Sequence, residues 1–165
     1  VLCMGAWSPR LLRDLGLKVP LMAERGDHVE FREPGVEVYN SLMDVDAKVV
    51  ASSMEGGLRV AGQAEFAPVD APPNKRRQKQ LTQVAAAAFP GRQTQAVKFW
   101  MGRRPSFPDS LPAIGPVPGH AGLYVNFGHS HYGLMMAPGS GETLAANLCN
   151  ERQNKPLAVY ALDRF

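Results

Sequence analysis

Two adjacent arginines stand in the most constrained segment of the chain. Residues 100–115 read WMGRRPSFPDSLPAIG, so that Gly102 and several prolines surround Arg103 and Arg104. A rigid backbone that holds a guanidinium predicts a fixed anion site, because arginine binds a carboxylate through paired hydrogen bonds and rigidity reduces the entropy lost on binding. The alternative is that one arginine pairs with Asp109 and the other faces solvent. Composition alone favours neither interpretation.

A second segment whose residues could take part in chemistry covers residues 128–141 and reads GHSHYGLMMAPGSG. Glycines before a helix let backbone N–H groups approach an anionic or electron-rich group closely. His129 and His131 are two residues apart, a spacing that suggests a metal site. However, no third ligand stands at a convincing spacing. We therefore predict no metal site. A catalytic base is another role open to these histidines, but packing against the backbone is favoured.

The middle of the chain has the pattern of an antiparallel sheet with a helix. Short runs with β character alternate with turn residues, and Glu55-Gly56-Gly57 predicts a tight hairpin turn. Pro72-Pro73 precedes an amphipathic helix over 74–89, whose apolar face carries Leu81 and Ala85. The predicted strands cover 28–31, 36–43, 48–54, 58–62 and 95–101.

Each flank of this middle part combines a strand, a glycine turn and a helix. Before it, we expect a strand at 1–4 and a helix that Ser8 caps and that ends near Leu15. After it, we expect little regular structure from 104 to 119 apart from a short strand near 113–114. A strand at 123–127, a helix over 141–150 and a packed terminal arm follow. Flanks of this kind belong to one α/β layer that an insertion interrupts.

The composition, with 45% hydrophobic and 20% charged residues, is that of a globular domain, and no apolar stretch approaches the length needed to span a bilayer. The net charge of +3 is mild, and the basic run 75–79 is interpreted as a solvated helix face rather than a nucleic-acid contact. Cys3 and Cys149 are expected to be buried free thiols in a reducing compartment, although a bridge between them stays open. We expect no signal peptide, and an opening of VLCMG indicates a core strand entered partway.

The arginine segment resembles a motif of the D-amino-acid oxidase superfamily, W-x-G-x-R-P-x-x-x-D-x-x-P-x-I-G. That group includes glycine oxidases, sarcosine oxidases and the small subunit of bacterial D-amino-acid dehydrogenases, and the last of these is the most similar branch. The resemblance implies that Arg104, directly before the proline, binds the substrate carboxylate, while Arg103 occupies a variable position.

The glycine-rich segment is similar to a flavin motif of the same superfamily, G-H-x-x-x-G-hydrophobic-x-x-A-P-x-x-G. The opening VLCMGAWSPRLL resembles the strand, turn and helix in which G-A-W-S approaches the cofactor. The resemblance implies FAD as the cofactor and Tyr132 as a residue that reaches the substrate. The residues that it places near FAD are Gly5, Ala6, Trp7, Gly128, His129, Gly133, Leu134 and Met135.

The middle segments ERGDHVEF and GLRVAGQAEF resemble strands of the D-amino-acid dehydrogenases. Asp27 stands where those proteins have Tyr, and Gln63 where they have Thr, which leaves the substrate specificity open. His28, in the first of these strands, is a further candidate for substrate binding.

We predict an α+β fold in which residues 21–105 form a substrate domain, mostly antiparallel sheet, between two pieces (1–20 and 106–165) of an incomplete FAD-binding α/β domain. The dinucleotide fingerprint G-x-G-x-x-G is absent from these residues. An FAD needs that first βαβ unit for its pyrophosphate and adenosine. We therefore expect a C-terminal part of a longer chain that by itself neither binds FAD tightly nor turns over, and whose missing N-terminal half is its partner.

The leading functional hypothesis is oxidative deamination of D-amino acids, with a hydride moving from Cα to flavin N5 and Arg104 holding the carboxylate. The alternatives are an amine oxidation like that of sarcosine or glycine oxidases, and a non-enzymatic module that binds a small carboxylate or RNA. The electron acceptor stays open, and no nucleic-acid partner is expected. We expect a cytoplasmic protein, with a peripheral position on the inner membrane as a further option for the full-length protein.

Overall fold

The computed structural model describes residues 1–93, 97–151 and 157–165, and these form two compact units. Unit 1 consists of Val1–Glu24, Phe66–Val69 and Arg103–Phe165. Unit 2 consists of Arg25–Glu65 and Asp70–Gly102. None of the helices in the described residues is long and apolar enough to cross a membrane.

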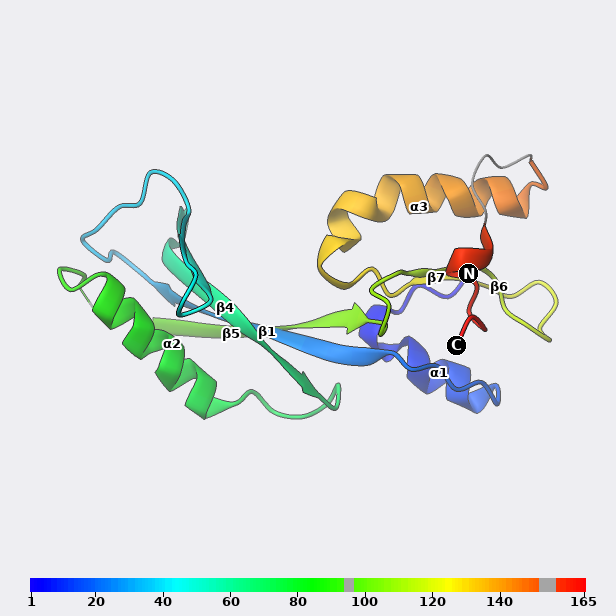
Figure 1. The fold of residues 1–165 in the computed structure, drawn as a ribbon, viewed down its shortest axis with the longest axis horizontal. Coiled ribbons are helices and arrows are strands. Elements are labelled where there is room, and N and C mark those ends of the chain that lie inside the picture. The colour runs from blue at the N-terminus through cyan, green and yellow to red at the C-terminus, as the bar shows by residue number, and fades with distance from the viewer. Residues whose placement is uncertain (94–96, 152–156) are drawn as a thin grey trace. The chain divides into compact units, whose positions relative to one another are not determined.

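A five-stranded sheet with the order β2-β3-β4-β1-β5 is the main element of unit 2 (Figure 1). β2 pairs antiparallel with β3, and β3 with β4, as the sequence predicts for this region. The β3–β4 turn requires glycine at 57, where φ is +123° and an added Cβ would lie 2.1 Å from the carbonyl oxygen of Phe31. The strands are β1 (Met22–Phe31), β2 (Leu42–Asp44), β3 (Val49–Met54), β4 (Gly57–Ala67) and β5 (Val97–Ser106).

The helix α2 (Lys75–Ala88) packs against this sheet and agrees with the helix that the sequence predicts. Leu81 and Ala85 are fully buried, in one cluster with Val29, Phe31 and other side chains of the sheet. Asn74 caps the helix, since its side chain accepts a hydrogen bond of 3.0 Å from the backbone N–H of Arg76.

One ion pair ties the first turn of α2 to the sheet, and a second joins two strands of that sheet. Asp27 on β1 pairs with Arg77, and Arg25 on the same strand pairs with Glu65 on β4. The side chain of Asn74 donates a hydrogen bond of 3.1 Å to Glu65. These hydrogen bonds, first that of Asn74 and then that of Arg25, lower the pKa of Glu65. Asp27, at the position where the resemblance implies a tyrosine in the dehydrogenases, is thus the charged partner of Arg77.

Unit 1 combines helices with a two-stranded antiparallel hairpin of β6 (Ala113–Pro116) and β7 (Tyr124–Phe127). Its helices are α1 (Ser8–Asp14) and α3 (Gly133–Leu148), together with the short 3-10 helices η1 (Gly5–Trp7), η2 (Ser130–Tyr132) and η3 (Leu157–Tyr160). The core is built from Leu2, Leu12, Leu21, Phe107, Ala113, Val117, Val125, Phe127 and Leu162.

Near the N-terminus the structure corrects two predictions. The predicted strand at 1–4 is a single parallel bridge between Leu2 and Val125. Ser8 is the first residue of α1 and not its cap, because the N-cap position belongs to Trp7 and the Ser8 hydroxyl is buried. Both cysteines are free as predicted, but they are exposed and not buried.

The predicted strand at 36–43 is reduced to β2 (Leu42–Asp44). Part of the reason is that the backbone N–H of Val38 donates to the side chain of Ser53, at 2.9 Å, instead of to a neighbouring strand. By contrast, β5 is longer than predicted, because it continues through Arg103 and Arg104 to Ser106 instead of ending at Met101. Pro105 is tolerated there because β5 is an edge strand of the sheet. The predicted start of this strand, residues 95 and 96, lies outside the described residues.

The glycine-rich segment is helical from Gly133, although the sequence predicts a loop as far as Gly141. Local propensity disfavours a helix that contains Gly139, Gly141 and Pro138. Contacts of α3 with β6 and β7 override it, and Leu144 of this helix is buried. The segment therefore places its first residues on a helix N-terminus.

We predict that Asp27→Ala lowers the free energy of unfolding by roughly 3 kcal/mol, because it leaves Arg77 as a buried cation without its partner. Urea unfolding measures this change. Asp46→Ala, which removes an exposed carboxylate of the same unit, is the matched control and should stay within about 0.5 kcal/mol of the unmodified protein. Equal losses in the two variants would contradict the role given to this ion pair.

Candidate active site

Five polar side chains from three segments of unit 1 meet near the start of α3. Glu24 comes from the first residues of β1, and Arg104 and Ser106 come from the last residues of β5. Ser130 and His131 come from η2, which an antiparallel bridge between Ser106 and His129 holds beside β5. Adjacent strands and one bridge therefore gather residues that are distant in the sequence.

A closed ring of contacts joins four of these side chains. One oxygen of the Glu24 carboxylate, Oε2, lies 2.8 Å from the Ser106 hydroxyl, which lies 2.9 Å from the Ser130 hydroxyl. Ser130 Oγ is 3.1 Å from Nδ1 of His131, and Nε2 of the same ring is 3.1 Å from Oε1 of Glu24. The side chain of Glu24 is only 10% exposed, whereas that of His131 is 47% exposed. The ring thus connects a buried carboxylate to the surface.

Arg104, the arginine predicted to bind the substrate carboxylate, also lies beside Glu24. Its Nη1 lies 3.9 Å from Oε1 of Glu24, which is an ion-pair distance but too long for a hydrogen bond, and the side chain is 35% exposed. Within the described residues no other acidic group lies at ion-pair distance from Arg104. Its guanidinium donors therefore remain available to an anion.

Arg103 has a different environment. Its Nε donates a hydrogen bond to the backbone oxygen of Val69, and its guanidinium lies 5.9 Å from the centre of the Trp7 ring. The sequence leaves open that Asp109 pairs with one of the two arginines. In the structure Asp109 instead binds Arg164, through contacts of 2.7 and 3.1 Å. That alternative for Asp109 is wrong, and Arg104 is the less engaged of the two arginines.

The residues predicted near FAD fall on two segments of unit 1. Gly5, Ala6 and Trp7 form η1, in which Gly5 has a φ of +54° and Trp7 is 41% exposed. Gly128 has a φ of +90°, and a Cβ there would lie 2.4 Å from the ring of Phe107. Both glycines are therefore required by the backbone of their turns.

His129 is partly buried, and among the described residues its Nε2 has no hydrogen-bond partner. Burial lowers the pKa of His129, which favours the neutral ring. This environment agrees with a packing role for His129. Within the described residues no three His, Cys, Asp or Glu side chains are grouped to hold a metal ion.

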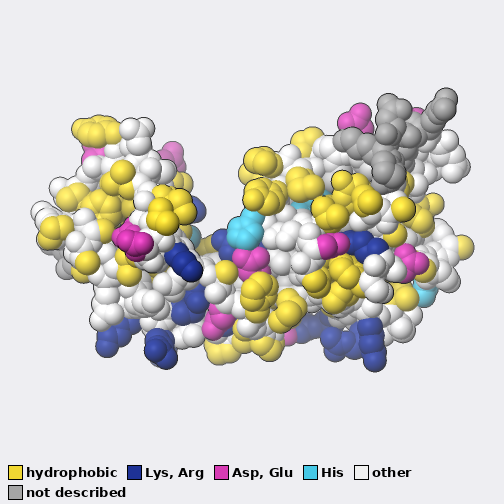
Figure 2. Space-filling view, viewed as in Figure 1, with side chains coloured by type: hydrophobic (Ala, Val, Ile, Leu, Met, Phe, Trp, Pro, Cys, Tyr) yellow, Lys and Arg dark blue, Asp and Glu magenta, His cyan; other side chains and the backbone are white. Residues whose placement is uncertain are grey.

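The first turn of α3 has the properties of a flavin contact. Leu134 is 95% exposed and Met135 is 78% exposed, and Figure 2 shows hydrophobic side chains at the surface over this end of the helix. The N-cap residue, Tyr132, makes no side-chain capping hydrogen bond, and the first turn holds no acidic residue. N-terminal amides without a cap favour an electron-rich acceptor, and exposed apolar side chains suit a planar ring. Gly133, Leu134 and Met135 therefore fit the flavin that the sequence predicts here.

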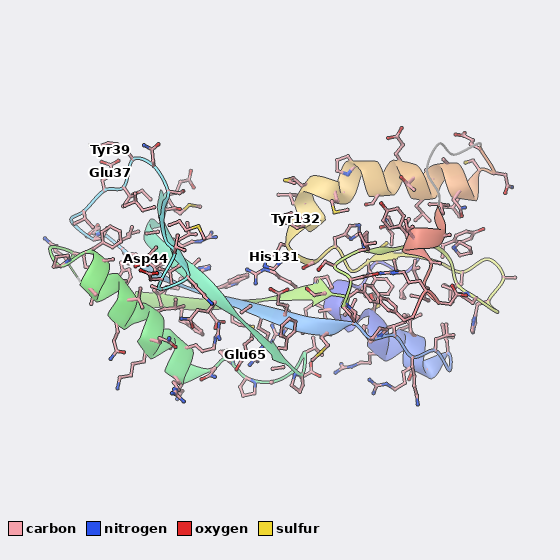
Figure 3. The ribbon with its side chains drawn as sticks, in the orientation of Figure 1. Glu37, Tyr39, Asp44, Glu65, His131 and Tyr132 are labelled. Carbon is pink, nitrogen blue, oxygen red and sulfur yellow. The ribbon has the colours of Figure 1, made fainter. Side chains whose placement is uncertain are left out.

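Two further residues are predicted to bind the substrate. Tyr132 lies beside the ring of contacts that joins Glu24, Ser106, Ser130 and His131, whereas His28 belongs to unit 2. Tyr132 is 57% exposed, with its ring centroid 6.2 Å from that of His131, and Figure 3 shows both side chains at the start of α3. His28 stacks on Trp100 at 5.0 Å in unit 2. Burial, then the charge of Arg59, lowers the pKa of His28. The roles of Arg104, Tyr132 and His28 in substrate binding stay predictions.

The sequence alone does not identify the four residues of the ring of contacts as a functional group. Glu24, Ser106 and Ser130 stand inside the segments that the motifs single out, but no local pattern connects them. For the two histidines, His129 and His131, the sequence raises a metal site and a catalytic base, and it favours neither. The pairing of β1, β5 and η2 is the information that was missing.

The model of the family FAD dependent oxidoreductase (DAO) matches residues 1–147, and the chain belongs to this family. Its members are FAD-dependent flavoproteins, as the resemblance of the motifs implies. Fold and family together define the chain as a part of an FAD-dependent oxidoreductase fold.

The chain is also similar to two curated relatives. The chain is 37% identical over its whole length to a D-amino-acid oxidase of Bradyrhizobium diazoefficiens, of which it covers 40%. It is 34% identical over 90% of its length to a D-amino acid dehydrogenase of Xylella fastidiosa, of which it covers 35%. The chain thus spans about two fifths or less of the length of these relatives.

Solved structures confirm the mixed fold of helices and antiparallel sheet. A glycine oxidase from Geobacillus kaustophilus superposes with a TM-score of 0.79 at 24% identity, over 98% of this chain and 44% of that one. The iminodiacetate oxidase of Chelativorans sp. BNC1 superposes with a TM-score of 0.77 at 25% identity, over 97% of this chain and 44% of that one.

The contact between Asp109 and Arg164 yields a prediction about pH. The hydrogen bond from Arg164 is the main cause of the lowered pKa of Asp109. A lowered pKa in the folded state stabilises the protein above the pKa of the unfolded state, and this stabilisation disappears as the pH falls through the folded value. Asp109→Asn should therefore cost roughly 1 kcal/mol at about pH 7 and almost nothing at about pH 2, as measured by urea unfolding.

The exposed Asp163, in the same terminal segment, provides the control for this experiment. Asp163→Asn should change the free energy of unfolding little at either pH. A loss in Asp109→Asn that is the same at both pH values would refute the assignment of the effect to this ion pair.

Proposed function

We propose that this chain supplies the substrate-binding part of an enzyme that oxidatively deaminates D-amino acids. The observation that carries the proposal is Arg104, a partly exposed arginine beside a buried carboxylate and without a hydrogen-bonded acidic partner among the described residues. The names of the two curated relatives support the substrate class. Family membership supports an oxidation that uses FAD.

In this proposal Arg104 binds the α-carboxylate of the substrate. The planar guanidinium matches a carboxylate with two parallel hydrogen bonds, so that it fixes both the position and the orientation of the substrate. Glu24 keeps the guanidinium near its own carboxylate without using its donors in a hydrogen bond. Fixing one end of the substrate holds Cα in one place, which is an orientation effect on the reaction.

The cofactor would be held by η1 (Gly5, Ala6 and Trp7), by Gly128 and His129 between β7 and η2, and by the first turn of α3 (Gly133, Leu134 and Met135). When bound, FAD supplies the acceptor, N5, for the hydride from Cα of the substrate. The exposed Leu134 and Met135 exclude water from that side. The amides at the start of α3 favour negative charge near the helix.

An amine oxidation like that of sarcosine or glycine oxidases is the second candidate. The similarity to iminodiacetate oxidase favours it, because iminodiacetate has carboxylates and a secondary amine. Arg104 would serve the same purpose for such a substrate. Rates for D-alanine, sarcosine, glycine and iminodiacetate in the full-length enzyme separate the two candidates.

We predict that Arg104→Leu in the FAD-loaded full-length enzyme raises KM for D-alanine roughly 10- to 100-fold, because a charged pair of hydrogen bonds is lost. Arg104→Lys should have an intermediate effect, since it keeps the charge but not the fork. Steady-state kinetics measure KM, and urea unfolding checks the fold.

Arg103→Leu is the matched control, because the neighbouring arginine binds Val69 and lies over Trp7. Its KM should stay within about 3-fold of that of the unmodified enzyme, while its stability falls. An unchanged KM in Arg104→Leu would show that Arg104 is not the carboxylate site.

A further inference from the structure

We propose that His131, held by Glu24 and Ser130, accepts the proton that the ammonium group of the substrate loses before oxidation. This inference rests on the function proposed above and adds a catalytic residue to it. Glu24 and Ser130 are positioning residues in this account. Three observations support the inference: the contacts within the ring, the exposure of His131 and the position of His131 beside Arg104.

The number of hydrogens in the ring is the first argument. Four contacts join Glu24, Ser106, Ser130 and His131, and each needs one hydrogen between two heavy atoms. With Glu24 ionised, each serine hydroxyl supplies one hydrogen and a neutral imidazole supplies one. The ring is therefore one hydrogen short, and two acceptors face each other at one contact.

One added proton completes the ring. With both nitrogens of His131 protonated, Nε2 donates to Glu24 and Nδ1 donates to Ser130. The geometry has the Ser106 hydroxyl directed at both Glu24 and Ser130, but it carries one hydrogen. With that hydrogen on Glu24, the contact between the two serines takes its hydrogen from Ser130. Every polar atom at the four contacts is satisfied, and the imidazolium lies against a buried carboxylate. Proton acceptance thus adds a hydrogen bond as well as a charge pair.

Access and charge are the second argument. The side chain of His131 is about half exposed, so that a substrate can approach it, while Glu24 is buried. Among the described residues, Glu24 from β1 is the acidic member of the ring of contacts and Arg104 from β5 is the charged group beside it. Both His131 and Arg104 lie next to the same oxygen of Glu24. An α-amino acid carries its carboxylate and its ammonium group one carbon apart. Arg104 is suited to the first group and His131 to the second.

The proposed step is a proton transfer that changes no oxidation state. An N–H bond of the ammonium group breaks, its electron pair stays on nitrogen, and the proton moves to the imidazole of His131. The amine that results has the lone pair that expels a hydride from Cα. The proton later leaves to solvent through the exposed edge of His131.

The test uses the FAD-loaded full-length enzyme and D-alanine, mixed rapidly without oxygen while the loss of flavin absorbance is followed. His131→Gln keeps an N–H donor for Glu24 but cannot accept a proton. At about pH 7 we expect reduction at least roughly 10-fold slower than in the unmodified enzyme. The difference should shrink toward about one near pH 10, because D-alanine then arrives as the free amine. His120→Gln makes the same substitution at a histidine outside the ring of contacts, where Nδ1 lies 3.0 Å from the backbone oxygen of Pro118, and it is the control that should show no such dependence on pH.

A ratio that stays constant across this range would overturn the inference, since a purely structural defect does not depend on the protonation of the substrate. Equal rates at about pH 7 would overturn it as well. If D-alanine fails to reduce the flavin of the unmodified enzyme, the proposed function itself is wrong and the inference falls with it. In His131→Ala, added imidazole should restore part of the rate, and an absence of rescue counts against proton transfer.

A second readout needs no turnover. α-Aminoisobutyrate has no hydrogen on Cα and cannot be oxidised, so that its complex with the enzyme is stable. Nitrogen NMR of labelled histidine should show both ring nitrogens of His131 protonated in this complex. A ring with a single protonated nitrogen would overturn the inference.

Discussion

A buried carboxylate is stable only where donors or cations surround it, because the interior cannot replace the water that it loses. Glu24 meets this requirement with the hydroxyl of Ser106, the ring of His131 and the more distant guanidinium of Arg104. Each of these contacts also restricts the group that makes it. One buried charge therefore positions a partly exposed arginine and a partly exposed histidine, which are the two groups of unit 1 best suited to the two charges of an amino acid. The proposed chemistry depends on this one anion.

Unit 2 follows the same physical rule with a different outcome. Arg25, Asp27, Glu65 and Arg77 are charges at the contact between the sheet and α2, and they pair with one another. Because each of these charges is paired with an opposite charge of the same unit, they fix the start of the helix and are not left for a charged ligand. The contrast with Arg104 distinguishes a structural arginine from one available for binding: the guanidinium of Arg77 is hydrogen-bonded to Asp27, while that of Arg104 lies at ion-pair distance only.

Much of this arrangement was predictable from the sequence, and the failures have physical causes. The helix over 74–89 and the turn at Gly57 were predictable because amphipathic periodicity and glycine act locally. The helical start of α3 was not, because tertiary contacts override the propensities of Gly139 and Pro138. The extension of β5 to Ser106 was missed because a proline is allowed on an edge strand, and the sequence does not say which strand is the edge. Arg104 was found through its motif, whereas Glu24 joins the site only through strand pairing.

The central claim is that Arg104 and the Glu24–His131 pair together bind the two charged groups of an amino acid. A crystal structure of the FAD-loaded full-length enzyme with bound α-aminoisobutyrate tests it most directly. The account predicts the carboxylate of the ligand within hydrogen-bond distance of two guanidinium nitrogens of Arg104, and its amine within hydrogen-bond distance of the ring of His131. A ligand whose carboxylate binds other residues, with Arg104 still beside Glu24 and in contact with solvent, would contradict it.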